Sequence, residues 1–231
     1  MKKIYVSPSD QFRNIYAVGN TNEKKQCHAI AAALVTALER CGMQAKTNYT
    51  ASMQERVKES NEWGADLHLP IHTNAYNGKV KGTRLFCYDK TGEGYRASVA
   101  VMADLAPITP GESDSITVHH YYEVKYAHAP TVYLEVGFHD NKEEAAWIID
   151  HTEDIAEAIC RGVCAHYGVE YVAPGDDRPE QEAEPTETLY RIQLGAYRNR
   201  SNAERRLAEA KAAGFADAFI KADAFIKKEE K

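Results

Sequence analysis

The chain has 231 residues, of which 44% are hydrophobic and 27% are charged, and its formal net charge is −6. These values are typical of a soluble globular protein and allow one sizeable domain plus a small one. The acidic balance argues against nucleic acid as the main partner, and no apolar stretch approaches the ~20 residues that a membrane span needs, so no membrane insertion is expected.

The five cysteines are odd in number and lack close pairing spacings, which is typical of a protein made in a reducing compartment. Cys160 and Cys164 lie four residues apart in a predicted helix, where we expect them to be small buried hydrophobes. The basic N-terminus carries an apolar run far too short for a signal peptide. We therefore expect synthesis in the cytoplasm without a signal peptide.

The first half of the chain alternates between strand and helix patterns. Residues 3–7 predict a short strand, and residues 22–41 predict a helix whose apolar positions share one face. Residues 53–63 predict a second helix, because Ser52 with Glu55 three residues later is a capping-box pattern.

Further strands and helices follow as far as residue 167. The patterns predict strands at 65–72, 83–88 and 131–137 and helices at 95–105, 142–149 and 152–167. Alternation of this kind predicts an α/β fold with a mixed, largely parallel sheet flanked by helices on both faces. In such folds functional side chains gather at the strand ends and in the loops beyond them.

The C-terminal quarter differs in composition. Residues 171–188 are acidic, contain proline and are nearly free of large apolar groups, so they predict a linker between a domain at 1–170 and a segment at 189–231. Within that segment we expect a small α+β unit, with a strand at 189–197, a helix at 201–213 capped by Ser201, and a strand at 215–220.

Two apolar runs carry polar side chains that suggest chemistry. The strand at 65–72 ends in a His-x-Asn-Ala motif that begins at His72, and the run at 130–141 contains a lone carboxylate, Glu135. A buried carboxylate is costly unless it is paired, hydrogen-bonded or functional. A histidine at the end of one strand and a glutamate within another suggest a metal-hydrolase site at one edge of the sheet.

These motifs, together with the Val-Tyr-Leu-Glu-Val-Gly-Phe sequence of residues 132–138, resemble the type 3 family of zinc-dependent N-acetylmuramoyl-L-alanine amidases, found in phage endolysins and bacterial autolysins. The resemblance extends over residues 1–169. It implies hydrolysis of the amide between N-acetylmuramic acid and L-alanine in peptidoglycan, with zinc as the cofactor.

The resemblance implies three zinc ligands: His72, Glu23 at the start of the first helix, and a histidine after the first strand. This chain has Asp10 where that histidine would stand. Aspartate is a legitimate zinc ligand, but the resulting site is richer in oxygen and less selective for zinc. His28 is a rival third ligand, and loss of the metal is a further alternative.

The same resemblance implies roles around the metal. Zinc would polarise the scissile carbonyl and acidify a water, while Glu135 would act as general base and then protonate the leaving amine. Four residues near these motifs are predicted to bind substrate: Asn74, His139, Lys125 and His128.

Several of these residues also have an ordinary structural interpretation. Glu23 could close a capping box with Asn20, Asp10 could stabilise a turn, and Glu135 could be a salt-bridged strand residue. His68 lies four residues before the strand-end histidine, about 13 Å along an extended strand, so we expect it to be packed or to support the site.

Residues 190–197, Tyr-Arg-Ile-Gln-Leu-Gly-Ala-Tyr, and the helix after them resemble a SPOR domain, a family that binds peptidoglycan glycan strands stripped of stem peptides. The segment is shorter than a full module, and residues 216–221 recur directly as 222–227. We therefore expect bacterial peptidoglycan as the partner.

Together these features predict a zinc amidase of the phage or prophage endolysin type, which acts at the cell wall after release. The alternative is a metal-free, degenerate amidase fold that only binds peptidoglycan. Asp10 favours that alternative, and the joint presence of His72 and Glu135 opposes it. A zinc carboxypeptidase acting on stem peptides is a third hypothesis, and it needs a carboxylate-binding arginine, for which Arg84 and Arg96 are candidates.

Overall fold

The structure is a computed structural model that describes residues 1–111, 114–176, 199–215, 218 and 220. The chain forms two compact units, Met1–Asp176 and Asp177–Lys231. The strands are β1 (Lys3–Pro8), β2 (Gln44–Lys46), β3 (Leu67–Asn74), β4 (Arg84–Cys87), β5 (Ser115–Val118) and β6 (Tyr133–Phe138). The helices of the first unit are α1 (Glu23–Arg40), α2 (Met53–Trp63), α3 (Glu93–Leu105), the 3-10 helix η1 (Ala106–Ile108), α4 (Tyr122–Tyr126), α5 (Lys142–Asp150) and α6 (Thr152–Tyr167).

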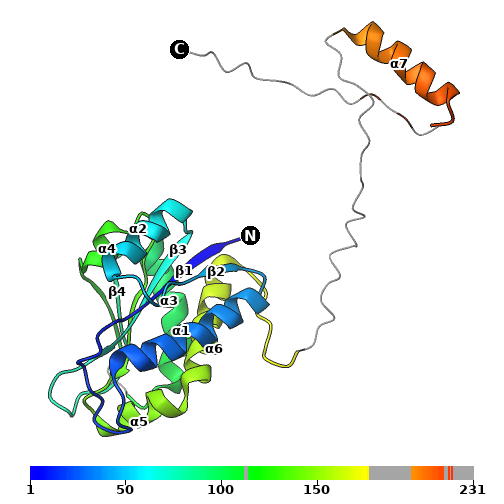
Figure 1. Ribbon diagram of the computed structural model, residues 1–231. Helices are drawn as coiled ribbons and strands as arrows, with labels where there is room; N and C mark the ends of the chain where they lie inside the picture. The colour runs from blue at the N-terminus through cyan, green and yellow to red at the C-terminus, as the bar shows by residue number, and fades with distance from the viewer. Residues whose placement is uncertain (112–113, 177–198, 216–217, 219, 221–231) are drawn as a thin grey trace. The chain divides into compact units, whose positions relative to one another are not determined.

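The first unit is built on one sheet with the strand order β2-β1-β3-β6-β4-β5. All neighbouring pairs are parallel except β4 and β6, which are antiparallel. Helices α1, α3 and α6 lie on one side of the sheet and α2 and α4 on the other (Figure 1). The predicted α/β class, with its mixed and largely parallel sheet, is confirmed.

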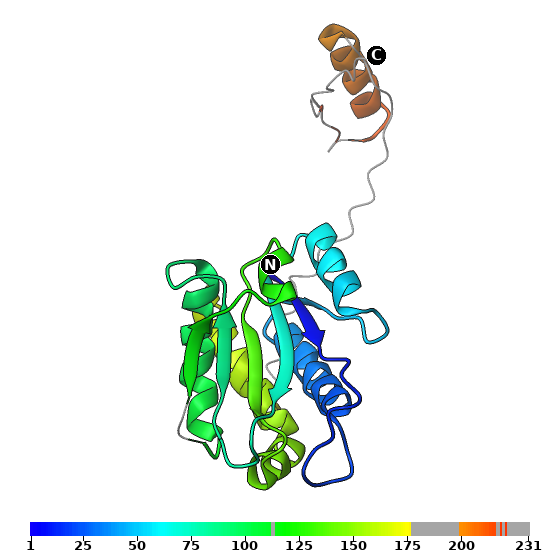
Figure 2. The same cartoon turned by 90° about the vertical axis from the view of Figure 1, so that its left-hand side faces the viewer.

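Figure 2 shows the strands of the sheet side by side, with the helix α1, in blue, behind them. Along β3, successive side chains alternate between the core and the opposite face. Leu69 and Ile71 of β3 are fully buried in the hydrophobic core, whereas His68 and His72 point to the opposite face. The parallel register of β3 with β6 places His72 beside Glu135. The sheet thus brings together the two residues that the apolar runs singled out.

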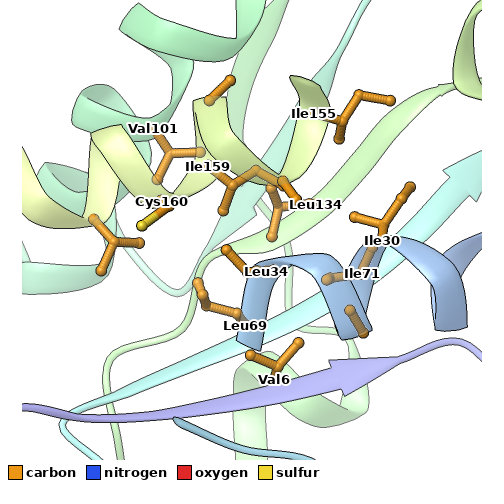
Figure 3. Close-up of a cluster of buried hydrophobic side chains, with 14 of the residues drawn as sticks. Val6, Ile30, Leu34, Leu69, Ile71, Val101, Leu134, Ile155, Ile159 and Cys160 are labelled. Carbon is orange, nitrogen blue, oxygen red and sulfur yellow. The ribbon is translucent and has the colours of Figure 1, made fainter. Parts of the chain in front are cut away.

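The core lies between the sheet and helices α1, α3 and α6 (Figure 3). Val6 and Leu134 from the strands meet Leu34 of α1, Val101 of α3 and Ile159 of α6, and all are fully buried. Burial of each such side chain contributes about 1.5–3 kcal/mol, so this layer holds the strand ends rigidly in place.

Capping side chains fix where the helices start. The Asn22 side chain caps α1 by accepting a hydrogen bond from the Lys25 amide at 3.0 Å. Ser52 and Glu55 form the predicted capping box at the start of α2. Since Asn22 is the N-cap of α1, Glu23 does not form the capping box with Asn20 that the sequence also allowed.

Four short elements were not predicted from the sequence. They are β2, β5, α4 and the 3-10 helix η1, which are only three to five residues long. Such segments are too short to display a period of two or 3.6 residues, and α4 consists of tyrosines around a single Glu-Val-Lys.

None of the helices in the described residues combines the length and apolar character needed to cross a membrane.

The second unit contains α7 (Arg200–Ala212). Its N-cap is Asn199, which accepts from the Ser201 amide at 2.9 Å, so the prediction of Ser201 as the cap was wrong by two residues. The strand predicted at 189–197, most of the linker and half of the strand predicted at 215–220 lie outside the described residues. The first residues assigned to the linker, Tyr171 and Val172, pack against the core of the first unit.

Substitution of Gly162 by alanine is expected to destabilise the first unit by about 2 kcal/mol or more. A Cβ there would lie 2.4 Å from Val101 Cα, because α3 and α6 approach closely at this point. The gain of about 1 kcal/mol in helix propensity is smaller than the cost of this overlap. Gly168→Ala is the control, since its Cβ meets no atom within 4 Å and costs only the strain of a left-handed backbone. Thermal unfolding of both variants checks this order, which equal stability of the two would contradict.

Candidate active site

His72 is the centre of a polar cluster at the carboxyl end of β3. Its Nδ1 lies 2.9 Å from Glu23 Oε1 and 3.3 Å from Gln11 Nε2. The ring stacks on Tyr133 at 4.7 Å, and the β3–β6 register shifts immediately after it, between His72 and Asn74. Irregularities of this kind re-aim side chains next to functional sites.

Glu23 is nearly fully buried at the first position of α1. Its Oε2 accepts a hydrogen bond from Asn14 Nδ2 at 2.6 Å, which leaves Oε1 turned toward His72. Burial alone would raise the pKa of Glu23, but the contact with His72 and the hydrogen bond from Asn14 outweigh it and lower that pKa. The carboxylate is therefore held ionised beside the imidazole.

The side chain that joins this pair is Gln11, not Asp10. Both residues are exposed, but Gln11 Nε2 lies 3.5 Å from Glu23 Oε1 and 3.3 Å from His72 Nδ1, whereas Asp10 has no hydrogen bond to either residue in the described part of the chain. Within the described residues, Asp10, Glu23 and His72 do not form a group with ligand atoms within 4.8 Å of one another. The loop after β1 thus presents Gln11, the residue that follows Asp10, to Glu23 and His72.

His28, the rival ligand, packs elsewhere. Its ring lies 5.1 Å from that of Tyr49, and its Nε2 is buried without a hydrogen-bond partner in the described residues. The position five residues after Glu23 turns it away from His72, as the helical geometry suggested.

Glu135 is only partly exposed, and its Oε2 is buried without a hydrogen-bond partner among the described residues. A salt-bridged strand residue would have its oxygens satisfied. Burial raises the pKa of Glu135 to about 8, the charge of His72 lowers it, and the charge of Glu23 raises it further. A carboxyl that titrates near neutral pH beside a histidine is suited to proton transfer.

Glu123 of α4 is a site residue that sequence reasoning missed. It is fully buried, and its Oε1 accepts from Ser7 Oγ and lies 3.3 Å from His68 Nε2. Its Oε2 faces His72 Nε2 at 3.6 Å, and neither atom has a hydrogen-bond partner in the described part of the chain. The prediction that His68 is packed is confirmed, since it is fully buried and also bonded to Ser60.

The charges of this cluster are mutually dependent. Burial would lower the pKa of His72, but Glu123, Glu23 and Glu135 outweigh it and raise that pKa to about 9. Burial would likewise raise the pKa of Glu123, but His68 and His72 lower it to about 2. Without a metal, the structure therefore favours an imidazolium held between two carboxylates.

The four predicted substrate contacts do not gather around His72. Asn74 is partly exposed at the end of β3, and its Oδ1 accepts from the Ala75 amide at 2.8 Å. His139 is buried, stacked on Tyr16 and bonded to Thr73, so it ties β3 to the chain after β6.

Lys125 and His128 line a separate hollow of about 350 Å³ together with Tyr88, Tyr95 and Thr131. None of the residues that meet at His72 lines this hollow. The predicted contact of Lys125 and His128 with a substrate bound at His72 has no support in this arrangement.

A cluster of thiols is the second group that could hold a metal. Cys41, Cys160 and Cys164 are free and buried, and their sulfurs lie within 4.8 Å of one another. Cys41 follows the last residue of α1, whereas Glu23 is its first, and a helix of 18 residues is about 27 Å long. The thiol cluster is therefore distinct from the cluster around His72.

Comparison with known proteins places this arrangement in a family. The sequence profile of Amidase_3, N-acetylmuramoyl-L-alanine amidase, matches residues 13–165, and that of the SPOR domain matches residues 186–230. The chain is 25% identical over 228 residues to N-acetylmuramoyl-L-alanine amidase CwlM of Bacillus licheniformis, covering 95% of this chain and 85% of that protein. It is also 25% identical over 225 residues to the sporulation-specific N-acetylmuramoyl-L-alanine amidase of Bacillus subtilis strain 168, covering 93% and 83%.

Solved structures show the same fold. The catalytic domain of CwlV, an N-acetylmuramoyl-L-alanine amidase from Bacillus (Paenibacillus) polymyxa var. colistinus, superposes with a TM-score of 0.67 at 18% identity, covering 74% of this chain and all of that one. The catalytic domain of the CD27L endolysin, which targets Clostridia difficile, gives a TM-score of 0.62 at 19% identity, covering 71% and 98%. With a family profile matched over most of its length, the chain belongs to the Amidase_3 family of N-acetylmuramoyl-L-alanine amidases.

Proposed function

We propose that this protein is a zinc-dependent amidase that hydrolyses the bond between N-acetylmuramic acid and L-alanine in peptidoglycan. The observation that carries the proposal is the convergence of His72, Glu23 and Glu135 at one strand end, with buried polar atoms left unsatisfied. A protein that only binds peptidoglycan has no need for an unpaired, partly buried carboxyl beside a histidine.

The residues at this position fit a zinc ion. His72 Nδ1 and Glu23 Oε1 are 2.9 Å apart, and the Gln11 amide is 3.3 and 3.5 Å from them. Histidine nitrogen and carboxylate oxygen are normal zinc ligands. The Gln11 amide oxygen, which accepts from Asn14 Nδ2 at 2.9 Å, would be the third donor to such an ion if the amide turned toward His72.

Zinc bound there would supply Lewis acidity, polarising the scissile carbonyl and lowering the pKa of a water toward ~7. Glu135 would take the proton from the attacking water and deliver it to the nitrogen of the departing L-alanine. Asn14 would keep Glu23 oriented, because it donates to the oxygen of Glu23 that faces away from His72. The stacked ring of Tyr133 would hold the plane of the imidazole.

Binding to the cell wall is the second part of the proposal. The SPOR profile match supports an affinity of residues 186–230 for peptidoglycan, adjoining the catalytic unit in the same chain. We further propose release to the wall in a phage or prophage lysis role, supported by the likeness to the CD27L endolysin. The likeness to the sporulation-specific amidase supports a role in the bacterial cell as the second candidate.

Removal of zinc is expected to abolish hydrolysis, and stoichiometric zinc to restore it. Purified peptidoglycan would be digested by the full chain, and mass spectrometry of the products would show muramyl groups with a free lactyl carboxylate and peptides with a free L-alanine amine. Metal content would be measured on the wild type, His72→Ala and Cys164→Ser. We expect zinc to be lost only from His72→Ala, because the thiol cluster is a separate site.

Other outcomes would reject parts of the proposal. Zinc that is lost from Cys164→Ser and kept by His72→Ala would move the metal to the thiol cluster. Hydrolysis that survives complete removal of metal would reject the zinc mechanism. Wall binding without any cleavage by the zinc-loaded protein would support the degenerate, binding-only alternative.

A further inference from the structure

Glu123 has no role in the proposed set of zinc ligands, yet it is a fully buried carboxylate next to that set. Burying a carboxylate is expensive unless hydrogen bonds or charges compensate it. The short helix α4 presents it beneath the sheet face that carries His68 and His72. Its two carboxylate oxygens have different surroundings.

One oxygen of Glu123 is fully used. Oε1 accepts from Ser7 Oγ and lies 3.3 Å from His68 Nε2. Ser7 in turn accepts from the buried Arg56 guanidinium at 2.9 Å, so the carboxylate is anchored by a chain of buried contacts from α2 and β1. The anchoring leaves Oε2 as the only free oxygen and fixes its direction.

That free oxygen faces His72. Oε2 lies 3.6 Å from His72 Nε2, and both atoms are buried without another partner in the described residues. The other ring nitrogen, Nδ1, faces Glu23 and Gln11. A carboxylate next to Nε2–H fixes the tautomer that leaves the Nδ1 lone pair for a metal.

We propose that Glu123 is a positioning residue that holds the His72 imidazole through Nε2 so that Nδ1 is presented to the metal. The effect of Glu123 on zinc affinity rests on the proposed function, whereas the contact between Glu123 Oε2 and His72 Nε2 does not. Removing such a carboxylate behind a metal-bound histidine typically lowers metal affinity 10–100-fold.

The test compares Glu123→Gln with Glu144→Gln. Glu144 is also fully buried, but its oxygens accept from the backbone amides of Gly82 and Phe138 and it does not face His72. We expect the zinc dissociation constant of the folded protein, measured by competition with a chelator, to rise 10–100-fold in Glu123→Gln and by less than about twofold in Glu144→Gln. If Glu123→Gln does not fold, Glu123→Asp replaces it, since the shorter side chain widens the gap to Nε2.

A second readout needs no metal. NMR with ¹⁵N-labelled histidine would show a slowly exchanging Nε2–H of His72 in the metal-free wild type and in Glu144→Gln, and its loss in Glu123→Gln. Unchanged zinc affinity and an unchanged resonance in folded Glu123→Gln would overturn the proposal. If the wild type takes up no zinc, the proposed function fails, and the resonance alone then decides the role of Glu123.

Discussion

Replacement of Glu135 by glutamine is expected to lower the amidase kcat by ~10²–10⁴-fold while leaving zinc bound. Glutamine keeps the size of the side chain but cannot accept a proton, and Glu135 is not among the residues that contact His72 Nδ1. Product formation and metal content measured on the same preparation check this prediction. A variant that keeps more than a tenth of the wild-type rate would show that another group is the base.

The pH dependence of the enzyme follows from the same residue. A general base must be ionised, so kcat/KM should rise with pH through the pKa of Glu135, which burial raises to about 8 in the metal-free protein. A nearby dication favours the carboxylate, so the rising limb of the zinc-loaded enzyme should lie below pH 8.

The contribution of Glu135 to the folding stability of the metal-free protein should fall as pH rises, whereas kcat/KM should rise. Because the folded-state pKa of Glu135 lies above the ordinary value of 4.5, the folded state holds the proton more tightly, and this carboxyl costs stability as pH rises from about 4.5 to 8. Glu135→Gln removes that cost and should be more stable than the wild type at pH 8, by on the order of 1–2 kcal/mol after allowance for solvent screening. Thermal unfolding across pH measures the difference.

The fold could be predicted from long periodic segments with distinct ends. Helix α1 has one apolar face and an N-cap, and α2 begins at a capping box. Strands β3 and β6 alternate between core residues and residues of the opposite face. Segments of three to five residues carry no such period, and their conformation depends on what packs against them. This is why β2, β5, α4 and η1 emerged only in the structure.

The site residues that could be predicted from the sequence also lie in regular elements, and those that could not lie in short or irregular segments. His72 and Glu135 lie in regular strands, so the register of parallel neighbours brings them together as the sequence suggested. Glu123 lies in a helix of five residues, and its burial results from contacts with β1 and β3 that no local pattern encodes. Gln11 lies in the loop after β1, where a shift of one residue changes which side chain reaches His72.

The contact of Gln11 with His72 can be tested by substitutions at positions 10 and 11. We expect Gln11→Leu to weaken zinc binding about tenfold or more, Gln11→His to strengthen it about tenfold or more, and Asp10→Asn to leave it within about twofold. The reason is that the Gln11 amide lies 3.3 Å from His72 Nδ1, whereas Asp10 has no hydrogen bond to His72 or Glu23 among the described residues. An imidazole is a better zinc ligand than a neutral amide oxygen, so histidine at position 11 should restore the ligand set that the family resemblance implies.

Competition with a chromophoric chelator gives the dissociation constants, and the visible absorption of the Co²⁺-substituted protein reports the geometry of the ligands independently of activity. Loss of binding in Asp10→Asn, with none in Gln11→Leu, would return the third ligand to Asp10 and require the turn after β1 to rearrange around the metal. Loss in neither variant would leave His72 and Glu23 as the only protein ligands of this set. Two such ligands hold a dication weakly, so the wild-type protein would then release zinc far more readily than a three-ligand site does.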